Sequence, residues 1–182
     1  MIGKSRDSAT DHKPATSAGE PAVSEQRSRI MRSVAQKDTK PEMALRRALH
    51  AGGFRYRLHS TKVRGRPDLV LPKHGAVVLV HGCFWHRHEG CRYATNPKTR
   101  AEFWQVKFAA NVARDSAVQR ALFSADWRVA TIWECALRKP ELVSAAADRL
   151  SAWLLSGADM LELGEREVAA LTREGQDISS SS

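Results

Sequence analysis

AVVLVHGCFWHRHEGC, residues 76–91, is the stretch that decides the fold. Its first five residues form a continuous apolar run, which is typical of a central strand buried on both faces. The remaining residues hold three of the seven histidines and two of the three cysteines of the chain. Thiols and imidazoles at this density are typical of a metal site. The stretch therefore predicts a buried strand that leads directly into a metal-binding loop.

The candidate ligands in this loop are Cys83, His88 and Cys91, in the spacing Cys-x4-His-x2-Cys. Zinc prefers tetrahedral ligation by thiolates and imidazoles, so a fourth ligand is required. Cys135 is the remaining cysteine, and it would join a distant segment to the loop. One alternative is that the cysteines are buried and bind no metal. A disulfide is disfavoured by the odd cysteine count and by the lack of a secretory segment.

Two large aromatic residues, Phe84 and Trp85, lie between the candidate ligands, and His86 lies two residues before His88. One interpretation makes the two aromatic side chains ordinary core residues. The other makes them a surface for a flat partner such as a base pair, because a purely structural zinc loop has no need of exposed rings. The sequence leaves both interpretations open.

The composition favours a DNA- or RNA-binding protein with one domain of ordinary size. The chain has 182 residues, a hydrophobic content of 42% and a formal net charge of +9. A basic surface attracts nucleic acid or an anionic membrane. No apolar run approaches the ~20 residues of a membrane-spanning helix, so nucleic acid is the better prediction and no membrane partner is expected. The few cysteines, expected to be reduced, indicate the cytoplasm.

Hydrophobic periodicity predicts alternating helices and strands. Helices are expected from a capping box at Thr39 and Glu42 to Gly52-Gly53, over residues 99–125, and from Pro140 to Gly157. Strands are expected over residues 54–58, 68–71, 76–80 and 127–133. This order predicts an α/β fold with a mixed central sheet flanked by helices.

The domain boundaries follow from the polar ends of the chain. Residues 1–25 lack the apolar side chains that folding requires, so a disordered tail is predicted there. The compact domain is predicted over residues 26–157. A partly disordered C-terminal extension is predicted over residues 158–182, with a short strand and helix within residues 159–175.

A second metal site is predicted from the pairing of two strands. If the strands on either side of residues 72–75 form a hairpin, the carboxylate of Asp68 lies near the main chain of Val80 and His81. A carboxylate, a main-chain carbonyl and waters form a hard-oxygen site that suits Mg²⁺. His81 and His86 flank this place, and each can accept a proton from water or stabilise a phosphate. These residues favour metal-assisted phosphodiester hydrolysis.

The sequence holds several further motifs: Gly65-Arg66-Pro67-Asp68, the run from His81 to His88, Glu102-Phe103-Trp104, Asn111, Trp127-Arg128-Val129 and the run from Trp133 to Leu137. Together these motifs resemble those of the very short patch repair (Vsr) family of DNA mismatch endonucleases. The resemblance extends from about Arg27 to Leu155. It implies a fold like that of type II restriction endonucleases, a structural zinc ion, and a Mg²⁺-dependent nick on the 5′ side of the thymine in a T·G mismatch.

The resemblance also implies partners. T·G pairs arise when 5-methylcytosine deaminates, so the enzyme would act on double-stranded DNA beside a cytosine-C5 methyltransferase and mismatch-repair proteins. We expect a cytoplasmic, nucleoid-associated monomer, because the sequence shows no unassigned apolar stripe. The preferred flanking bases cannot be deduced from the sequence.

The resemblance assigns roles to individual residues. Asp68 corresponds to the metal-binding aspartate and Val80 to a metal-binding carbonyl, and His86 corresponds to the catalytic histidine, with His81 and Glu42 as supporting neighbours. The zinc ligands correspond to Cys83, His88, Cys91 and Cys135. The side chains that wedge into the duplex correspond to Phe84, Trp85 and Trp104, with Met31 entering from the other groove. Glu42 keeps a second interpretation as the capping-box residue of its helix.

The sequence departs from the family pattern in two places. Val80 replaces an expected threonine, and the segment from His88 to Cys91 is one residue longer than in some members, which Gly90 can absorb. The acidic-x-lysine pattern of broader nuclease families is also missing, so His86 would take the place of that lysine. Two rival hypotheses stay open: a zinc-containing nuclease of the same fold that cuts matched or modified DNA, and a non-catalytic zinc DNA-binding module.

Overall fold

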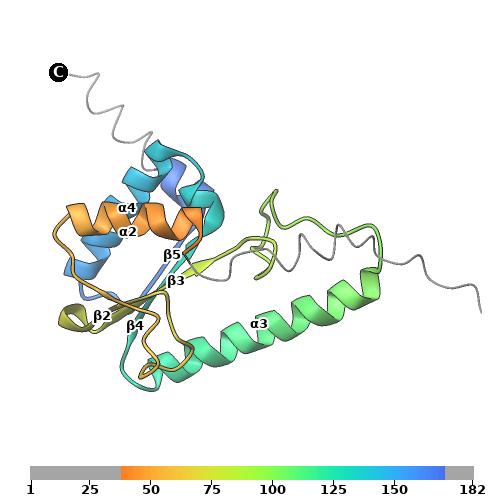
Figure 1. Cartoon of the computed structure of the whole chain (residues 1–182), viewed down its shortest axis with the longest axis horizontal. Coiled ribbons are helices and arrows are strands. Elements are labelled where there is room, and N and C mark those ends of the chain that lie inside the picture. The colour runs from red at the N-terminus through yellow and green to blue at the C-terminus, as the bar shows by residue number, and fades with distance from the viewer. Residues whose placement is uncertain (1–37, 171–182) are drawn as a thin grey trace, which may run out of the picture. The chain divides into compact units, whose positions relative to one another are not determined.

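Figure 1 shows a computed structural model of the chain, in which residues 38–170 are described. The predictions for the N-terminal tail and for Met31 lie outside these residues, as does the end of the C-terminal extension. The helices are α2 (Lys40–Ala51), α3 (Ala101–Phe123) and α4 (Pro140–Leu155). The strands are β1 (Arg57–Leu58), β2 (Leu69–Leu71), β3 (Ala76–His81), β4 (Arg128–Trp133) and β5 (Met160–Leu163), with two 3-10 turns, η1 (Pro72–His74) and η2 (Glu134–Leu137).

The five strands form one mixed sheet in the order β1-β2-β3-β4-β5. β1, β2 and β3 pair antiparallel, whereas β3, β4 and β5 pair parallel. The predicted hairpin is confirmed, with Leu69 opposite Val78 and Leu71 opposite Ala76. Gly75 closes its turn at a φ of 56°, a left-handed conformation that suits glycine. The predicted α/β class with a mixed sheet is therefore confirmed.

Helices cover both faces of the sheet (Figure 1). One face packs against α2 and α4, and its fully buried side chains include Leu45, Leu49, Leu71, Ile132 and Leu150. The opposite face packs against the C-terminal end of α3 through Val63, Val70, Val77, Leu79, Leu122 and Val129. Because both faces of β3 are covered, its apolar run is continuous rather than alternating.

α2 begins and ends where its sequence signals predict. The side chain of Thr39 accepts a hydrogen bond from the N–H of Glu42, and the side chain of Glu42 accepts one from the N–H of Thr39. This reciprocal capping box satisfies main-chain donors that the first turn leaves unpaired. Gly52 caps the other end. Of its two interpretations, Glu42 thus has at least the capping role.

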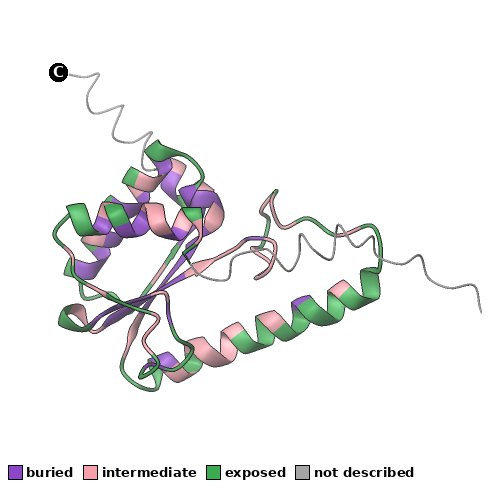
Figure 2. Ribbon diagram, viewed as in Figure 1, coloured by how far each residue is buried: buried purple, intermediate pink, exposed green. Residues whose placement is uncertain are grey.

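α3 is longer than the central strand of the sheet. Its 23 residues span roughly 35 Å, whereas the six residues of β3 span roughly 20 Å. The N-terminal half therefore projects beyond the sheet toward the loop that follows β3 (Figure 1). Most of α3 is exposed (Figure 2), including Phe103 and Val106 at 46% and 72% exposure. Phe103 and Val106 are three residues apart, so they lie on one side of the helix.

Two ends of the sheet differ from the prediction. β1 is reduced to Arg57–Leu58, because Phe54 and Tyr56 pack against the core while Leu58 is exposed. β5 lies beyond residue 157, where we expected the domain to end, yet it pairs with β4 and buries Leu163 in the main core. The expected strand and helix within residues 159–175 are present as β5 and a helical segment at residues 165–170. Within residues 38–170, no helix has the length and apolar character that crossing a membrane requires.

Candidate functional site

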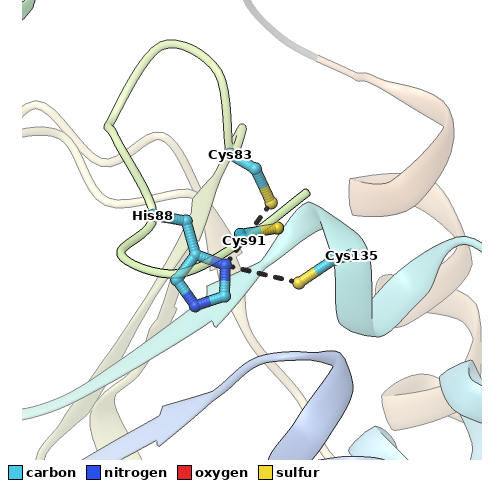
Figure 3. A group of neighbouring side chains, drawn as sticks. All are labelled: Cys83, His88, Cys91 and Cys135. Carbon is cyan, nitrogen blue, oxygen red and sulfur yellow. Dashed lines mark hydrogen bonds between the residues drawn. The ribbon is translucent and has the colours of Figure 1, made fainter. Parts of the chain in front are cut away.

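The four predicted zinc ligands converge (Figure 3). Cys83, His88, Cys91 and Cys135 each offer a ligand atom, and these atoms lie within 4.8 Å of one another. Nδ1 of His88 is 3.7 Å from Sγ of Cys83 and 3.4 Å from Sγ of Cys135. Zinc bonds of about 2.3 Å to sulfur and about 2.0 Å to nitrogen, at tetrahedral angles, separate the two atoms by about 3.5 Å. The cluster therefore has the donor set and the spacing that zinc requires.

The sheet explains why residues so far apart in sequence meet here. β3 and β4 are parallel neighbours, and their last paired residues are His81 and Trp133. Cys83 and Cys135 each lie two residues beyond that pair, at the same edge of the sheet. A metal ion bound there would join the ends of both strands, as the sequence predicts for Cys135.

The contacts within this cluster favour the ionised form of one thiol, that of Cys135. The pKa of Cys135 is lowered to about 6, first by its hydrogen bond with Cys83, against the effect of burial. The N–H of Glu165 donates to Sγ of Cys135 at 3.2 Å and lowers this pKa further. The bond to Cys135, together with burial, raises the pKa of Cys83. A thiolate is the form of cysteine that binds metals.

Trp133 and Gly164 both pack against the imidazole of His88. Its ring stacks on Trp133, with ring centroids 4.2 Å apart and planes within 5°. Gly164, the residue after β5, lies against the imidazole, because a Cβ at this position would be 2.7 Å from Cε1 of His88. The indole N–H of Trp133 donates to Glu162 of β5 at 2.7 Å. The strand beyond residue 157 thus helps to enclose the cluster.

Gly164→Ala is expected to loosen this cluster. The added methyl would lie 2.7 Å from Cε1 of His88 and 2.7 Å from Oε2 of Glu167, so the imidazole must shift. Overpacking of this kind costs about 1–3 kcal/mol of stability. We expect faster transfer of bound zinc to a colorimetric chelator and a lower Tm.

Gly157→Ala is the matched control, because a Cβ at that glycine meets nothing within 4 Å. Equal rates of zinc release from the two variants would show that Gly164 does not support His88.

A second cluster joins His81, His86 and Asp115. The two imidazole rings stack, with centroids 4.0 Å apart and planes within 7°. Nδ1 of His86 lies 2.5 Å from Oδ2 of Asp115 on α3. One turn earlier on α3, the side chain of Asn111 donates to the carbonyl of Trp85 at 3.1 Å. α3 therefore fixes the loop at two successive residues.

The charges in this cluster differ from residue to residue. Burial lowers the pKa of His81 to about 3, and the neighbouring charge of His86 adds to this effect. Burial by itself would raise the pKa of Asp115, but its hydrogen bond with His86 and the charge of that ring outweigh burial, and the pKa is lowered. The cluster therefore pairs a neutral His81 with a His86 that faces a carboxylate.

The predicted partners Asp68 and Val80 lie together. Oδ2 of Asp68 accepts a hydrogen bond of 2.7 Å from the main-chain N–H of Val80. Burial raises the pKa of Asp68, and this hydrogen bond opposes the rise. The carboxylate of Asp68 is thus bonded to the residue directly before His81, which stacks on His86. A carboxylate and a main-chain carbonyl are hard oxygen donors, so these residues fit Mg²⁺.

The structure brings Glu42 to a different neighbour from the one expected. Its carboxylate pairs with Arg46, and its Oε1 lies 3.5 Å from Nε2 of His59. These contacts, together with the capping bond to Thr39, lie on the Asp68 side of the site rather than beside His86. Burial, followed by the charge of Asp68, raises the pKa of Glu42, and Arg46 opposes this rise.

The predicted wedge residues form one aromatic cluster. The ring of Phe84 lies 5.0 Å from that of Trp85 and 5.5 Å from that of Trp104, and the two indoles are 5.9 Å apart. Phe108 of α3 packs beneath them, 5.1 Å from Phe84, and is buried. The three predicted residues are only half-buried. Both interpretations of these aromatics therefore hold in part, because the rings pack on one another and still present exposed surface.

Comparison with known proteins identifies the family. Residues 22–92 match the family model described as DNA mismatch endonuclease Vsr. The chain is 40% identical over 130 residues to the DNA mismatch endonuclease Vsr of Escherichia coli (strain K12), an alignment that covers 70% of this chain and 83% of that protein. This protein belongs to the Vsr family. The resemblance described from the sequence motifs is thereby confirmed.

Two further relatives of this Vsr family member are named as nicking enzymes. It is 47% identical over 113 residues to the type II nicking enzyme V.XorIIP of Xanthomonas oryzae pv. oryzae, covering 62% of this chain and 82% of the relative. It is 37% identical over 124 residues to the type II nicking enzyme V.NmeAIP of Neisseria meningitidis, covering 68% and 88%. DNA endonuclease activity is thus the function that the family shares.

Three polar residues of this Vsr site were missed in the sequence. Asp115 had a signal, because Asn111 and Asp115 are four residues apart and so lie on one face of the helix. His59 also had one, since Leu58 pairs with Leu69 in an antiparallel register, and the next pair in that register is His59 with Asp68. Arg46 looked like one of several surface arginines, and only the structure shows that it is 4% exposed.

Proposed function

We propose that this protein nicks double-stranded DNA on the 5′ side of the thymine in T·G mismatches, by Mg²⁺-dependent hydrolysis, and so initiates very short patch repair. It acts as a monomer in the cytoplasm, close to the nucleoid, and follows a cytosine-C5 methyltransferase whose product deaminates to thymine. Mismatch-repair proteins complete the repair. The observation that carries the proposal is that one loop, residues 82–91, holds half-buried aromatic rings directly beside the His86–Asp115 pair.

His86 is the general base in this proposal. Asp115 is an acceptor when ionised, so the 2.5 Å contact assigns the proton of the neutral imidazole to Nδ1. Nε2 is then left with a lone pair that can take a proton from water. The water oxygen attacks the phosphorus, and the bond from phosphorus to the 3′ oxygen breaks. That oxygen takes a proton from solvent water and leaves as a hydroxyl, and His86 returns its proton to solvent. His81 supports His86 by stacking, and its neutral state adds no charge beside it.

Asp68 and the carbonyl of Val80 would hold the Mg²⁺ ion. The ion would supply a Lewis acid that offsets the charge of the scissile phosphate. The N–H of Val80 keeps the carboxylate of Asp68 fixed, and each carboxylate oxygen has a second lone pair that can bind the cation. Cys83, His88, Cys91 and Cys135 would hold a zinc ion whose task is structural, because these side chains already fill four tetrahedral positions.

Mismatch recognition is assigned to Phe84, Trp85 and Trp104, with Met31 from the N-terminal segment. Wedging rings between base steps costs a few kcal/mol of stacking, and a mismatched step gives up less stacking than a matched one. Discrimination can therefore come from deformability of the duplex. Because the rings and His86 share one loop, a wedge that fails to enter would also leave His86 out of place.

A nicking assay on end-labelled duplexes tests the proposal. The substrates carry a single T·G pair, or T·A or C·G at the same position, and each is incubated with Mg²⁺ or with a chelator. We expect a Mg²⁺-dependent cut beside the thymine of the T·G duplex only. Cutting of matched DNA would instead favour a site-specific nicking enzyme, a candidate suggested by the names of the relatives from X. oryzae and N. meningitidis. Binding without cutting would indicate the non-catalytic zinc module.

Asp115→Asn is expected to slow nicking by about 10–100-fold, which is typical when the group that orients an imidazole is lost. Asparagine keeps the shape of the side chain, but its amide can donate to Nδ1 and so stabilise the wrong tautomer. DNA affinity should stay near that of the wild type, because the aromatic cluster is untouched. Single-turnover nicking and DNA binding are the measurements.

Asp148→Asn, at an exposed position of α4, is the matched control for this change of charge. A wild-type nicking rate in Asp115→Asn would remove Asp115 from the mechanism.

A further inference from the structure

A buried ion pair lies behind Asp68. Glu42 and Arg46 are one turn apart on α2, and their side chains are only 3% and 4% exposed. Nη1 of Arg46 also donates to Asp38 at 2.5 Å. A buried ion pair of this kind adds little net stability, because desolvation of two charges offsets their attraction. Its retention in the core suggests that the pair positions another group.

That group is His59, and the contact defines its tautomer. Nη2 of Arg46 lies 2.9 Å from Nε2 of His59. A guanidinium can only donate hydrogen bonds, so Nε2 must accept and the proton of the ring is on Nδ1. Oε1 of Glu42, 3.5 Å from the same nitrogen, holds Arg46 from the other side. The ion pair therefore fixes the position of the imidazole and makes Nδ1 its donor nitrogen.

The donor of His59 faces the carboxylate of Asp68. Nδ1 lies 3.9 Å from Oδ1 of Asp68, and the main-chain N–H of His59 donates to the carbonyl of Asp68 at 3.4 Å. The main-chain bond continues the register of β1 and β2, so the two residues are held opposite each other. His59 has a φ of 43°, in the left-handed region where, glycine apart, Asn, Asp and His are the most frequent residues. The backbone is thus held in an uncommon state where the ring meets Asp68.

We propose that His59 is a positioning residue for the metal-binding carboxylate, with the Glu42–Arg46 pair orienting its ring. Asp68 is then held on both oxygens, with Oδ2 bonded to the N–H of Val80 and Oδ1 directed by Nδ1–H of His59 across a gap that a small shift or one water closes. This inference rests on the proposed function only in taking Asp68 as a ligand of the divalent cation. A ligand oriented in advance binds its cation with less loss of entropy.

Three substitutions separate the donor from the bulk of the ring. His59→Asn keeps an N–H close to the position of Nδ1 and tolerates the left-handed backbone. His59→Gln places its amide near the position of Nε2 and leaves no donor toward Asp68, and His59→Ala removes both groups. The readout is the affinity for Mn²⁺, measured by the electron paramagnetic resonance signal of the free ion, with Asp68→Asn as the variant without a site. Thermal unfolding of each variant shows whether it is folded.

We expect His59→Gln and His59→Ala to weaken Mn²⁺ binding by about tenfold or more, the usual effect of losing a group that orients a ligand. His59→Asn should stay within about threefold of the wild type, and the Mg²⁺ concentration that half-saturates nicking should follow the same order. Wild-type affinity in all three folded variants, or equal weakening in all three, would overturn the inference. If the wild-type protein binds Mn²⁺ but does not nick T·G duplexes, the proposed function fails, whereas the order of Mn²⁺ affinities still decides the role of His59.

Discussion

His86→Ala is expected to lower the rate of nicking at a T·G pair by about 10²–10⁴-fold, the usual contribution of a general base. The imidazole lies 2.5 Å from Asp115 and 4.0 Å, between ring centroids, from His81, so the substitution removes the central member of that cluster. Both neighbours come from rigid elements, β3 and α3, and keep their positions. Single-turnover nicking with saturating enzyme measures the chemical step without the effect of substrate binding.

The zinc content and DNA affinity of His86→Ala should stay near wild type, because His86 is outside the Cys83–His88–Cys91–Cys135 cluster. His50→Ala is the matched control, since His50 is exposed at the end of α2. Unchanged nicking by His86→Ala would remove the general base from the mechanism. A loss of zinc or of DNA binding would mean that His86 has a structural role instead.

Cys135→Ala is expected to release the zinc ion and to destabilise the fold. Cys135 is 1% exposed, lies two residues beyond β4, and would be the ligand that joins this strand to the loop after β3. Structural zinc contributes about 10–16 kcal/mol of binding free energy in small zinc domains, so even partial loss is large against a typical stability of about 5–15 kcal/mol. We expect sub-stoichiometric zinc by elemental analysis and a large drop in Tm.

Lys139→Ala is a suitable control, because Lys139 lies two residues beyond the same 3-10 turn and is exposed. The wild-type protein treated with a strong chelator should reproduce the melting curve of Cys135→Ala. A variant that stays fully loaded with zinc and melts like the wild type would show that Cys135 is not a ligand. That result would leave Cys83, His88 and Cys91 as the candidate ligands, with a different fourth ligand to be identified.

Much of the fold could be predicted because its signals are local. The apolar run at residues 76–80 can be satisfied only in a strand covered on both faces, and β3 is that strand. The capping box at Thr39 and Glu42 forms as its spacing requires. The Cys/His cluster could be predicted for the same reason, since three of its members lie within nine residues of one loop and Cys135 is the one remaining cysteine.

The ends of the sheet could not be predicted in this way. β1 keeps only two residues, because Phe54 and Tyr56 are drawn into the core under α2 and α4 while Leu58 is left exposed. β5 is a short strand with a mixed pattern of burial, and its place at the edge depends on the parallel partner β4. In both cases tertiary packing outweighs a weak local preference.

The sequence by itself determined the α/β class, the central strand and the loop that carries thiols, imidazoles and aromatic rings, because each depends on residues close together in the chain. Only the tertiary structure decided which distant groups meet these residues. Asp115 reaches His86 because α3 lies against the loop that follows β3, and Arg46 reaches His59 because α2 packs beside the start of the sheet. Such contacts depend on how elements pack and on which charges lose their water, and neither is encoded in the spacing of residues along one segment.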